Sequence, residues 1–289
     1  MQIQWYPGHM AKSLRLIEEN LKLVDIVLYV LDARVPRSSF NPAFNKLLNG
    51  KPVVYILNKA DLAEEKATAA WLAEYAKIGT AVKLSANRTN AAKDLPALCR
   101  RILSEKLARY AVRGVKYSVK AMIIGVPNCG KSTLINNLTR TASAKVGNMP
   151  GVTRGKQWLK AGEIDLLDTP GVLWSDLKDQ ETARHLACAG CIKDDILDTV
   201  QLSKTMLGEL YALGGGTGVE KRYGLQQPSE ADAPAEAGLS VSIGVLFDAI
   251  AKRRGCIGAG GVLDAPRCAA VILEDFRTGK FGRITLEKS

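Results

Sequence analysis

Eight residues in the middle of the chain have the types and spacing needed to hold a nucleoside triphosphate. Residues 125–132 read Gly-Val-Pro-Asn-Cys-Gly-Lys-Ser and match the pattern G-x-x-x-x-G-K-S/T. The two glycines allow a tight turn whose backbone N–H groups point at phosphate oxygens, and a helix expected from about Lys131 to Leu138 adds the positive end of its dipole. Lys131 would then bridge the β- and γ-phosphates, and Ser132 would bind Mg²⁺ through its hydroxyl.

A chance match to this pattern is expected in roughly one per cent of chains of this length, and fewer chance matches would follow a strand and precede a helix. The run Val119–Ile124 before the loop is apolar enough to be a buried strand. We therefore interpret the loop as a nucleotide site. The loop residues expected to contact the nucleotide are Asn128, Cys129, Gly130, Lys131, Ser132 and Thr133.

A second set of residues, nearer the start of the chain, could read a guanine base. Asn58, Lys59 and Asp61 form an N-K-x-D motif directly after an apolar run at 53–57. The Asp61 carboxylate can accept both the ring N–H and the exocyclic amine of guanine, two donors that adenine does not present together. Lys59 would cover the base with its stem, and Asn58 would tie neighbouring loops together. After the next expected strand, Ser85-Ala86 could offer a backbone N–H to the guanine carbonyl.

A third set could respond to the γ-phosphate. Residues 168–171 read Asp-Thr-Pro-Gly and follow an expected hairpin at 156–167, about 36 residues beyond the phosphate loop. The pattern D-x-x-G is expected about once by chance in such a chain, so its place at a strand end gives it meaning. Asp168 would hold Mg²⁺ through a water, and the Gly171 N–H would sense the γ-phosphate. Thr153, in a loop rich in glycine and proline, is a candidate to reach the metal once a γ-phosphate is present.

The order of these motifs is unusual. In an ordinary GTPase the phosphate loop comes first and the guanine-reading motifs come last, but here the motifs at 58–61 and 85–86 precede the loop at 125–132. This order indicates a circularly permuted GTPase, a rearrangement tolerated because domain termini often lie close together at the surface. The segment that responds to the γ-phosphate would then continue directly into whatever follows residue 175.

The elements needed to position these motifs alternate between strand and helix. Alternation of this kind is typical of an α/β fold with a doubly wound, mostly parallel sheet. We expect a circularly permuted, Ras-like P-loop GTPase domain over residues 1–174, with an N-terminal helix at 10–23, and a small all-helical domain over residues 175–289. The other expected strands are 26–31, 53–57 and 81–84, and the other expected helices are 42–48, 64–76 and 94–110.

Length and composition are those of a globular protein with roughly two domains: 289 residues, 47% hydrophobic and 24% charged. No apolar run approaches the roughly 18 residues that span a bilayer, and the N-terminus lacks the apolar core of a signal peptide, so we expect a cytoplasmic protein without a membrane partner. Six scattered cysteines favour reduced thiols over a disulfide framework. The lone C-x-x-C of Cys188 and Cys191 favours two half-buried thiols on a helix over a zinc site.

The net charge of +11 is unevenly distributed. Residues 1–174 hold 26 basic against 13 acidic side chains, whereas residues 175–289 hold 14 against 16. Within the first part, 93–120 carries eight basic and two acidic residues, which predicts a surface facing nucleic acid or, equally, a simple solvated face. Two further basic clusters, 252–254 and 277–283, lie in the helical domain over 175–289 and could contact phosphates locally, so we expect this domain to bind RNA.

Nearly the whole chain resembles the ribosome biogenesis GTPase A family. The resemblance rests on the nucleotide motifs, on 5–12 (Trp-Tyr-Pro-Gly-His-Met-Ala-Lys), on 252–256 and on 275–285. It implies hydrolysis of GTP to GDP and phosphate, binding through rRNA to a late precursor of the bacterial large ribosomal subunit, and release after hydrolysis; DNA is not an expected partner. The stretch 214–240 is similar to a family-variable loop. A guanine-nucleotide switch that binds a protein or a different RNA is the alternative.

The way in which water is activated is open at this point. Val172 stands where Ras-like proteins carry a water-orienting glutamine. The resemblance suggests His9 as a catalytic residue beside Lys131 and Thr153, and the alternative is that His9 starts a helix or contacts RNA. The other histidine, at position 185, is expected to be packed or solvated. Asn128 resembles the asparagine through which related GTPases bind K⁺ near the β–γ bridge, where an added cation would offset developing charge.

Overall fold

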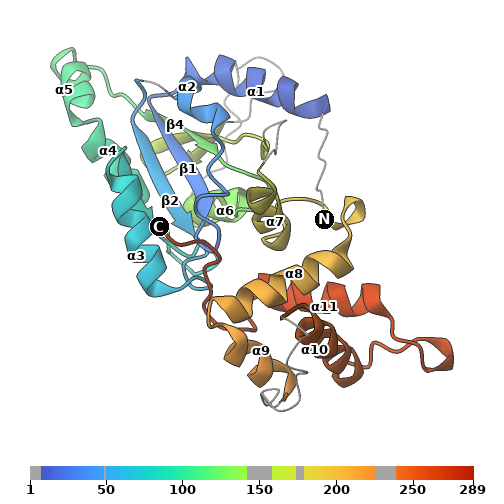
Figure 1. Ribbon diagram of the computed structural model, residues 1–289. Helices are drawn as coiled ribbons and strands as arrows, with labels where there is room; N and C mark the ends of the chain where they lie inside the picture. Colours follow the sequence, from blue (N-terminus) through green and yellow to red (C-terminus); the bar gives the residue numbers. More distant parts are fainter. Residues whose placement is uncertain (1–7, 49, 142–157, 174–178, 226–238) are drawn as a thin grey trace.

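The computed structural model describes residues 8–48, 50–141, 158–173, 179–225 and 239–289 (Figure 1). In this part of the chain one six-stranded sheet has the strand order β3-β2-β1-β4-β6-β5. The strands are β1 Ile26–Asp32, β2 Val53–Asn58, β3 Thr80–Lys83, β4 Val119–Ile124, β5 Trp158–Ala161 and β6 Ile164–Leu167.

The sheet is parallel except at one edge. Neighbouring strands from β3 through to β6 run parallel, and only β5 pairs with β6 in the antiparallel direction, as a hairpin. All seven residues of β1 are buried, because helices cover both faces of a parallel sheet and leave no wet side. The mostly parallel, doubly wound sheet predicted from the sequence is confirmed. Its register places Asp32 opposite Asn58, so the ends of β1 and β2 lie together.

The helices of the first half follow the predicted positions with one difference. They are α1 Gly8–Leu21, α2 Ala43–Leu47, α3 Glu65–Ala76, α4 Leu95–Ile102, α5 Ser104–Val112 and α6 Lys131–Thr141. The single helix predicted over 94–110 was wrong, because the chain leaves helical geometry at Leu103 (φ −101°, ψ 19°). The Leu103 side chain stays buried while α5 turns away and buries none of its own residues.

The second half is helical. Its helices are α7 Gln180–Cys188, α8 Thr199–Ala212, α9 Gly216–Tyr223, α10 Leu239–Arg253 and α11 Ala265–Arg277, and α8 packs against the other four (Figure 1). Aspartates cap α7, α8 and α11 by accepting backbone N–H groups of the first turn. The prediction of a loop over 214–240 was wrong at Gly216–Tyr223, which form α9. Residues 226–238 of that stretch lie outside the described residues.

The chain does not end within the helical half. After α11, residues 278–289 return to the first half and lie along the loops that follow β1 and β2 (Figure 1). The Leu286 N–H donates to the Arg34 carbonyl (2.8 Å), and the Ile284 N–H donates to the Leu62 carbonyl (2.9 Å). The two halves are therefore joined by the last residues as well as by the segment after β6.

Within the described ranges, no helix is long and apolar enough to cross a bilayer.

Candidate nucleotide-binding site

The ends of β2, β3 and β4 bring the predicted motifs to one edge of the sheet. Asn58, which is 2% exposed, links three of them. Its amide nitrogen donates to the Cys129 carbonyl in the phosphate loop (2.8 Å), and its amide oxygen accepts from the Ala86 N–H (2.9 Å). The structure therefore ties the guanine-reading motifs to the phosphate loop through one buried side chain.

Two glycines shape the phosphate loop. Gly125 (φ 153°) and Gly130 (φ 99°) adopt backbone angles that residues with a Cβ avoid. A Cβ at Gly125 would lie 2.4 Å from the Val30 carbonyl oxygen, and one at Gly130 would lie 2.2 Å from the Asn58 amide nitrogen. Such a cradle suits phosphate oxygens, because the close backbone approach leaves successive N–H groups free to converge on an anion.

The D-x-x-G segment lies directly against this loop. The Val172 N–H donates to the Gly125 carbonyl (3.2 Å). A Cβ at Gly171 would lie 2.9 Å from Lys131 Nζ, and Lys131, only 7% exposed, donates to the carbonyls of Gly125 (3.1 Å) and Val126 (2.8 Å). The residue expected to bridge phosphates and the glycine expected to sense them are thus neighbours.

Asp61 has the geometry of a base-reading carboxylate. Its backbone N–H donates to the Ser85 hydroxyl (3.1 Å), and its Oδ2 accepts from the Asn87 amide (3.3 Å). Its Oδ1 is buried and has no hydrogen-bond partner among the described residues. A buried carboxylate oxygen without a donor is costly, and the ring N–H and amine of guanine would satisfy it. The Ala86 N–H already donates to the Asn58 amide oxygen, so a hydrogen bond from it to the guanine carbonyl would have to be shared with Asn58.

Lys59 is held by a buried carboxylate that the sequence analysis did not single out. Lys59 Nζ lies 2.8 Å from Asp32 Oδ2 and donates to the Asn128 carbonyl (2.7 Å). Burial opposes the charge on Asp32, but Arg34 and Lys59 outweigh it and hold its pKa well below the ordinary value. Arg34 binds both Asp32 oxygens, at 3.0 and 2.7 Å. A signal was available, because charged residues directly after a fully apolar strand are rarely buried unless paired.

Arg34 and Asn128 connect the nucleotide site to the helical half. Arg34 Nη1 donates to the Arg277 carbonyl (3.0 Å). Asn128 Nδ2 donates to the carbonyl of Gly190, just beyond the end of α7 (2.7 Å). The Arg277 side chain in turn donates to the Cys188 carbonyl (3.1 Å). Through Asn128 and Arg34, the phosphate loop and the loop after β1 are therefore in hydrogen-bond contact with the C-terminal ends of α7 and α11.

The prediction of two half-buried thiols on a helix was wrong in two respects, their burial and the position of Cys191. Cys188 and Cys191 are 1% and 3% exposed, and Cys191 lies beyond the end of α7. Burial raises the pKa of each thiol to about 12, so both are neutral. No group of three or more histidine, cysteine, aspartate or glutamate side chains gathers as a metal site in the described part of the chain.

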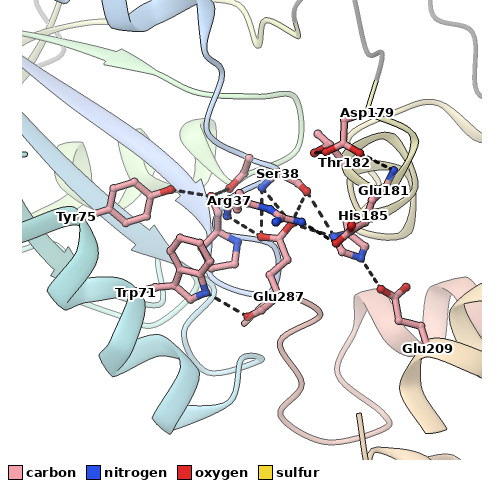
Figure 2. A network of polar contacts seen from close by, with 12 residues as sticks. Arg37, Ser38, Trp71, Tyr75, Asp179, Glu181, Thr182, His185, Glu209 and Glu287 are labelled. Atoms are coloured by element: carbon pink, nitrogen blue, oxygen red, sulfur yellow. Dashed lines mark hydrogen bonds and ion pairs between the residues drawn. The ribbon is translucent and has the colours of Figure 1, made fainter. Parts of the chain in front are cut away.

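Figure 2 shows a buried ionic network that holds the end of the chain in place. The His185 side chain is fully buried, and its Nδ1 and Nε2 lie 2.9 Å from Glu287 and 2.6 Å from Glu209. Glu287 also accepts the backbone N–H groups of Arg37 (2.6 Å) and Ser38 (3.1 Å). Burial disfavours the imidazolium, but the two carboxylates outweigh it and raise the His185 pKa to about 9. His185 was predicted to be packed or solvated, and no motif in the sequence indicated this network.

This network predicts a loss of stability in alkali. Because the pKa of His185 is higher in the folded state (about 9) than its ordinary value of 6.5, its contribution is complete below pH 6.5 and disappears as pH rises through about 9. The difference corresponds to about 3 kcal/mol. We expect the thermal unfolding temperature of the wild type to decrease as the pH rises from 6.5 to 9.5. In His185→Gln the unfolding temperature should depend less on pH over this range. A wild-type midpoint that stays constant over this range would contradict the assignment.

The remaining predicted residues are placed unevenly. Ser132 and Thr133 lie in the first turn of α6 and are exposed, and Asp168 is exposed directly after the end of β6. A hydroxyl and a carboxylate beside the phosphate loop suit Mg²⁺, which takes few protein ligands and shares phosphate oxygens. His9 lies in the first turn of α1, but its side chain is outside the described residues, as is all of Thr153.

Comparison with known proteins agrees with this geometry. Residues 120–207 match a family described as 50S ribosome-binding GTPase. Ribosome biogenesis GTPase A of Bacillus licheniformis is 42% identical over 295 residues, which cover 100% of this chain and 99% of that protein. The chain belongs to the ribosome biogenesis GTPase A family. The member from Bacillus cereus is 39% identical over 99% of this chain and 94% of its own length, and the member from Thermotoga maritima is 29% identical over 99% and 94%.

Solved structures show the same fold. The GDP-bound structure of TM YlqF covers 95% of this chain and 99% of its own, with a TM-score of 0.62 and 24% identity. GNP-bound YlqF from T. maritima covers 96% and 98%, with a TM-score of 0.62 and 23% identity. The predictions of the family and of a circularly permuted GTPase fold are confirmed. Ribosome biogenesis GTPase A proteins hydrolyse GTP to GDP and phosphate, so this chain is a guanine-nucleotide-binding GTPase.

Proposed function

We propose that this GTPase is a cytoplasmic assembly factor that binds a late precursor of the large ribosomal subunit through rRNA and is released after GTP hydrolysis. The observation that supports a timed release is the contact between the phosphate loop and the helical half, from Asn128 to Gly190 (2.7 Å). A loop that rearranges around phosphates can bias the α7 end through this bond. The names of the Bacillus relatives support ribosome assembly as the process.

In the proposed mechanism the protein positions charge around the transferring phosphoryl group. Lys131 moves from the carbonyls of its own loop to the β- and γ-phosphates, where its charge stabilises the transition state. Ser132, Asp168 and Thr153 would hold Mg²⁺, with Asp168 acting through a water. The ion would supply positive charge to offset the charge that develops on the phosphate oxygens. The Gly171 N–H reports the γ-phosphate to the segment that leads into α7.

Water activation requires a residue other than Val172, which is apolar and fully buried. We propose that His9 orients the attacking water, with a role at the start of α1 or on RNA as the alternative. We also propose that Asn128 binds K⁺. Its amide nitrogen donates to the Gly190 carbonyl, so its amide oxygen is the atom that could face a cation. Equal turnover in potassium and sodium salts would remove the potassium site.

The rRNA contact is proposed for the α5 surface, defined by Arg109, Arg113 and Lys116. All three side chains are exposed, and α5 buries none of its residues. The helix extends from the end of α4 on the side away from the helical half (Figure 1). A basic helix held outside the core suits a phosphate backbone, which rewards charge at the surface. In the cluster at 277–283, by contrast, Arg277 and Arg283 donate to carbonyls within the protein.

Sedimentation with large ribosomal subunits tests the proposed function. We expect binding with a non-hydrolysable GTP analogue and release with GDP. Replacing Arg109, Arg113 and Lys116 by alanine should weaken binding and make it less dependent on salt. The magnitude of the slope of log affinity against log salt concentration should decrease by about 2, because each lost phosphate contact contributes roughly 0.7 to 0.9 to that slope. A control with Lys46, Lys66 and Lys221 replaced removes the same charge elsewhere and should bind as wild type. Absence of binding in either nucleotide state would favour a switch acting on a protein or another RNA.

A further inference from the structure

The last residues of the chain lie along the loop that presents the base-reading carboxylate. This loop, residues 60–64, connects β2 to α3. The Ile284 N–H donates to the Leu62 carbonyl (2.9 Å), and the Thr285 hydroxyl accepts from the Glu64 N–H (3.1 Å). The tail therefore runs beside the loop and bonds to its backbone, although more than 200 residues of sequence separate the two.

One side chain of the tail holds both ends of this loop. Arg283 Nε donates to the Ala63 carbonyl (2.7 Å), and Arg283 Nη2 donates to the Ala60 carbonyl (3.0 Å) and pairs with Glu65 (2.7 Å). Asp61 follows Ala60 directly, so the guanidinium fixes the peptide plane that enters Asp61. The planar fork of arginine can hold two carbonyls at once, which a single ammonium cannot do in the same way.

The tail is itself fixed to the core. Phe281 and Leu286 are each 4% exposed, and the Trp71 indole N–H donates to the Glu287 carbonyl (3.1 Å). The Leu286 N–H donates to the carbonyl of Arg34, whose side chain binds Asp32, the partner of Lys59. A loop that is already bonded to a packed segment has little conformational freedom, so it loses less entropy when a nucleotide binds.

We propose that Arg283 is a positioning residue for guanine recognition, so that the C-terminal tail is a structural part of the nucleotide site. The inference rests on the GTPase activity of the family and not on the proposed ribosomal role. Asp61 discriminates guanine only if both of its oxygens meet the ring N–H and the amine together, since hydrogen bonds weaken steeply when misaligned. Arg283 supplies that alignment by holding the peptide before Asp61.

Nucleotide binding by the purified full-length protein tests this role. The probes are GDP and IDP, because hypoxanthine keeps the ring N–H of guanine but lacks the exocyclic amine. We expect Arg283→Ala to bind GDP about 10-fold more weakly and IDP only slightly more weakly, so that the ratio of the two affinities falls. Arg283→Lys keeps the charge but not the fork, and should lie between wild type and Arg283→Ala. Lys221→Ala, an exposed change on α9, is the matched control and should bind both as wild type.

The ratio separates a positioning role from a merely structural one. General loosening of the fold would weaken GDP and IDP alike, whereas misalignment of Asp61 weakens the nucleotide that uses both oxygens. If thermal unfolding shows that Arg283→Ala is not folded, Arg283→Lys decides the question. An unchanged ratio in the folded Arg283 variants would overturn the proposal. Because no ribosome is present in the assay, failure of the assembly role would leave this result unaffected.

Discussion

Replacing Lys131 with alanine is expected to abolish GTP turnover, with a fall in kcat of at least about 100-fold. The side chain is 7% exposed and lies beside Gly171, between the phosphate loop and the D-x-x-G segment. Its charge is the one that the loop can deliver to the phosphates, and alanine offers no donor in its place. Single-turnover hydrolysis, with the protein in saturating excess over GTP, measures the chemical step separately from product release.

The matched control is Lys66→Ala, which removes an exposed lysine from α3 and should hydrolyse GTP at the wild-type rate. Unchanged thermal unfolding of Lys131→Ala would show that the loss does not come from misfolding. A Lys131→Ala protein that keeps more than about a tenth of the wild-type rate would contradict the assigned role.

Replacing Asp61 with asparagine should change the preferred base. Asparagine keeps one acceptor but presents an amide donor to the guanine amine, so a charge-assisted pair of bonds is lost. At about 1.5–3 kcal/mol for each such bond, the affinity for GTP should fall on the order of 100- to 10,000-fold. Xanthine carries a carbonyl in place of that amine, and it should therefore bind the variant more tightly than guanine does. Competition between GDP and XDP gives the measurement.

Asp195→Asn is the control for this change, because it removes the same charge from an exposed position in η1, Asp194–Ile196, and should leave base preference unchanged. If Asp61→Asn still preferred guanine to xanthine, the base would have to be read elsewhere. The buried Asp61 Oδ1 would then need another donor.

The fold could be predicted because its signals are local. Ile26–Leu31 is apolar without interruption and Val119–Ile124 is apolar apart from the exposed Lys120, as expected for strands covered on both faces. The motifs could be predicted for the same reason, since Gly130, Lys131 and Asp61 sit at fixed spacings from the strand ends that present them. The break at Leu103 was missed because its neighbours keep a helical pattern on either side.

The contacts that join the two halves could not be predicted in this way. Arg283 meets Ala60 across 223 positions, and His185 meets Glu287 across 102. No motif or periodicity connects such residues, because their pairing follows from how the tail packs. A pattern also shows which residue carries a charge but not whether a partner neutralises it, so Arg277 and Arg283 resembled free phosphate ligands when they were bound to carbonyls. The nucleotide motifs thus located a candidate site, and only the structure showed that the tail contacts one of its loops.

The central claim is that loops from both parts of a reordered chain hold one guanine nucleotide. The most direct test is a crystal structure of the protein with a non-hydrolysable GTP analogue and Mg²⁺. We predict one nucleotide whose base lies within hydrogen-bond distance of the Asp61 carboxylate and whose β- and γ-phosphates lie within that distance of Lys131 Nζ. A nucleotide that reaches Lys131 while its base lies away from Asp61 would contradict this account.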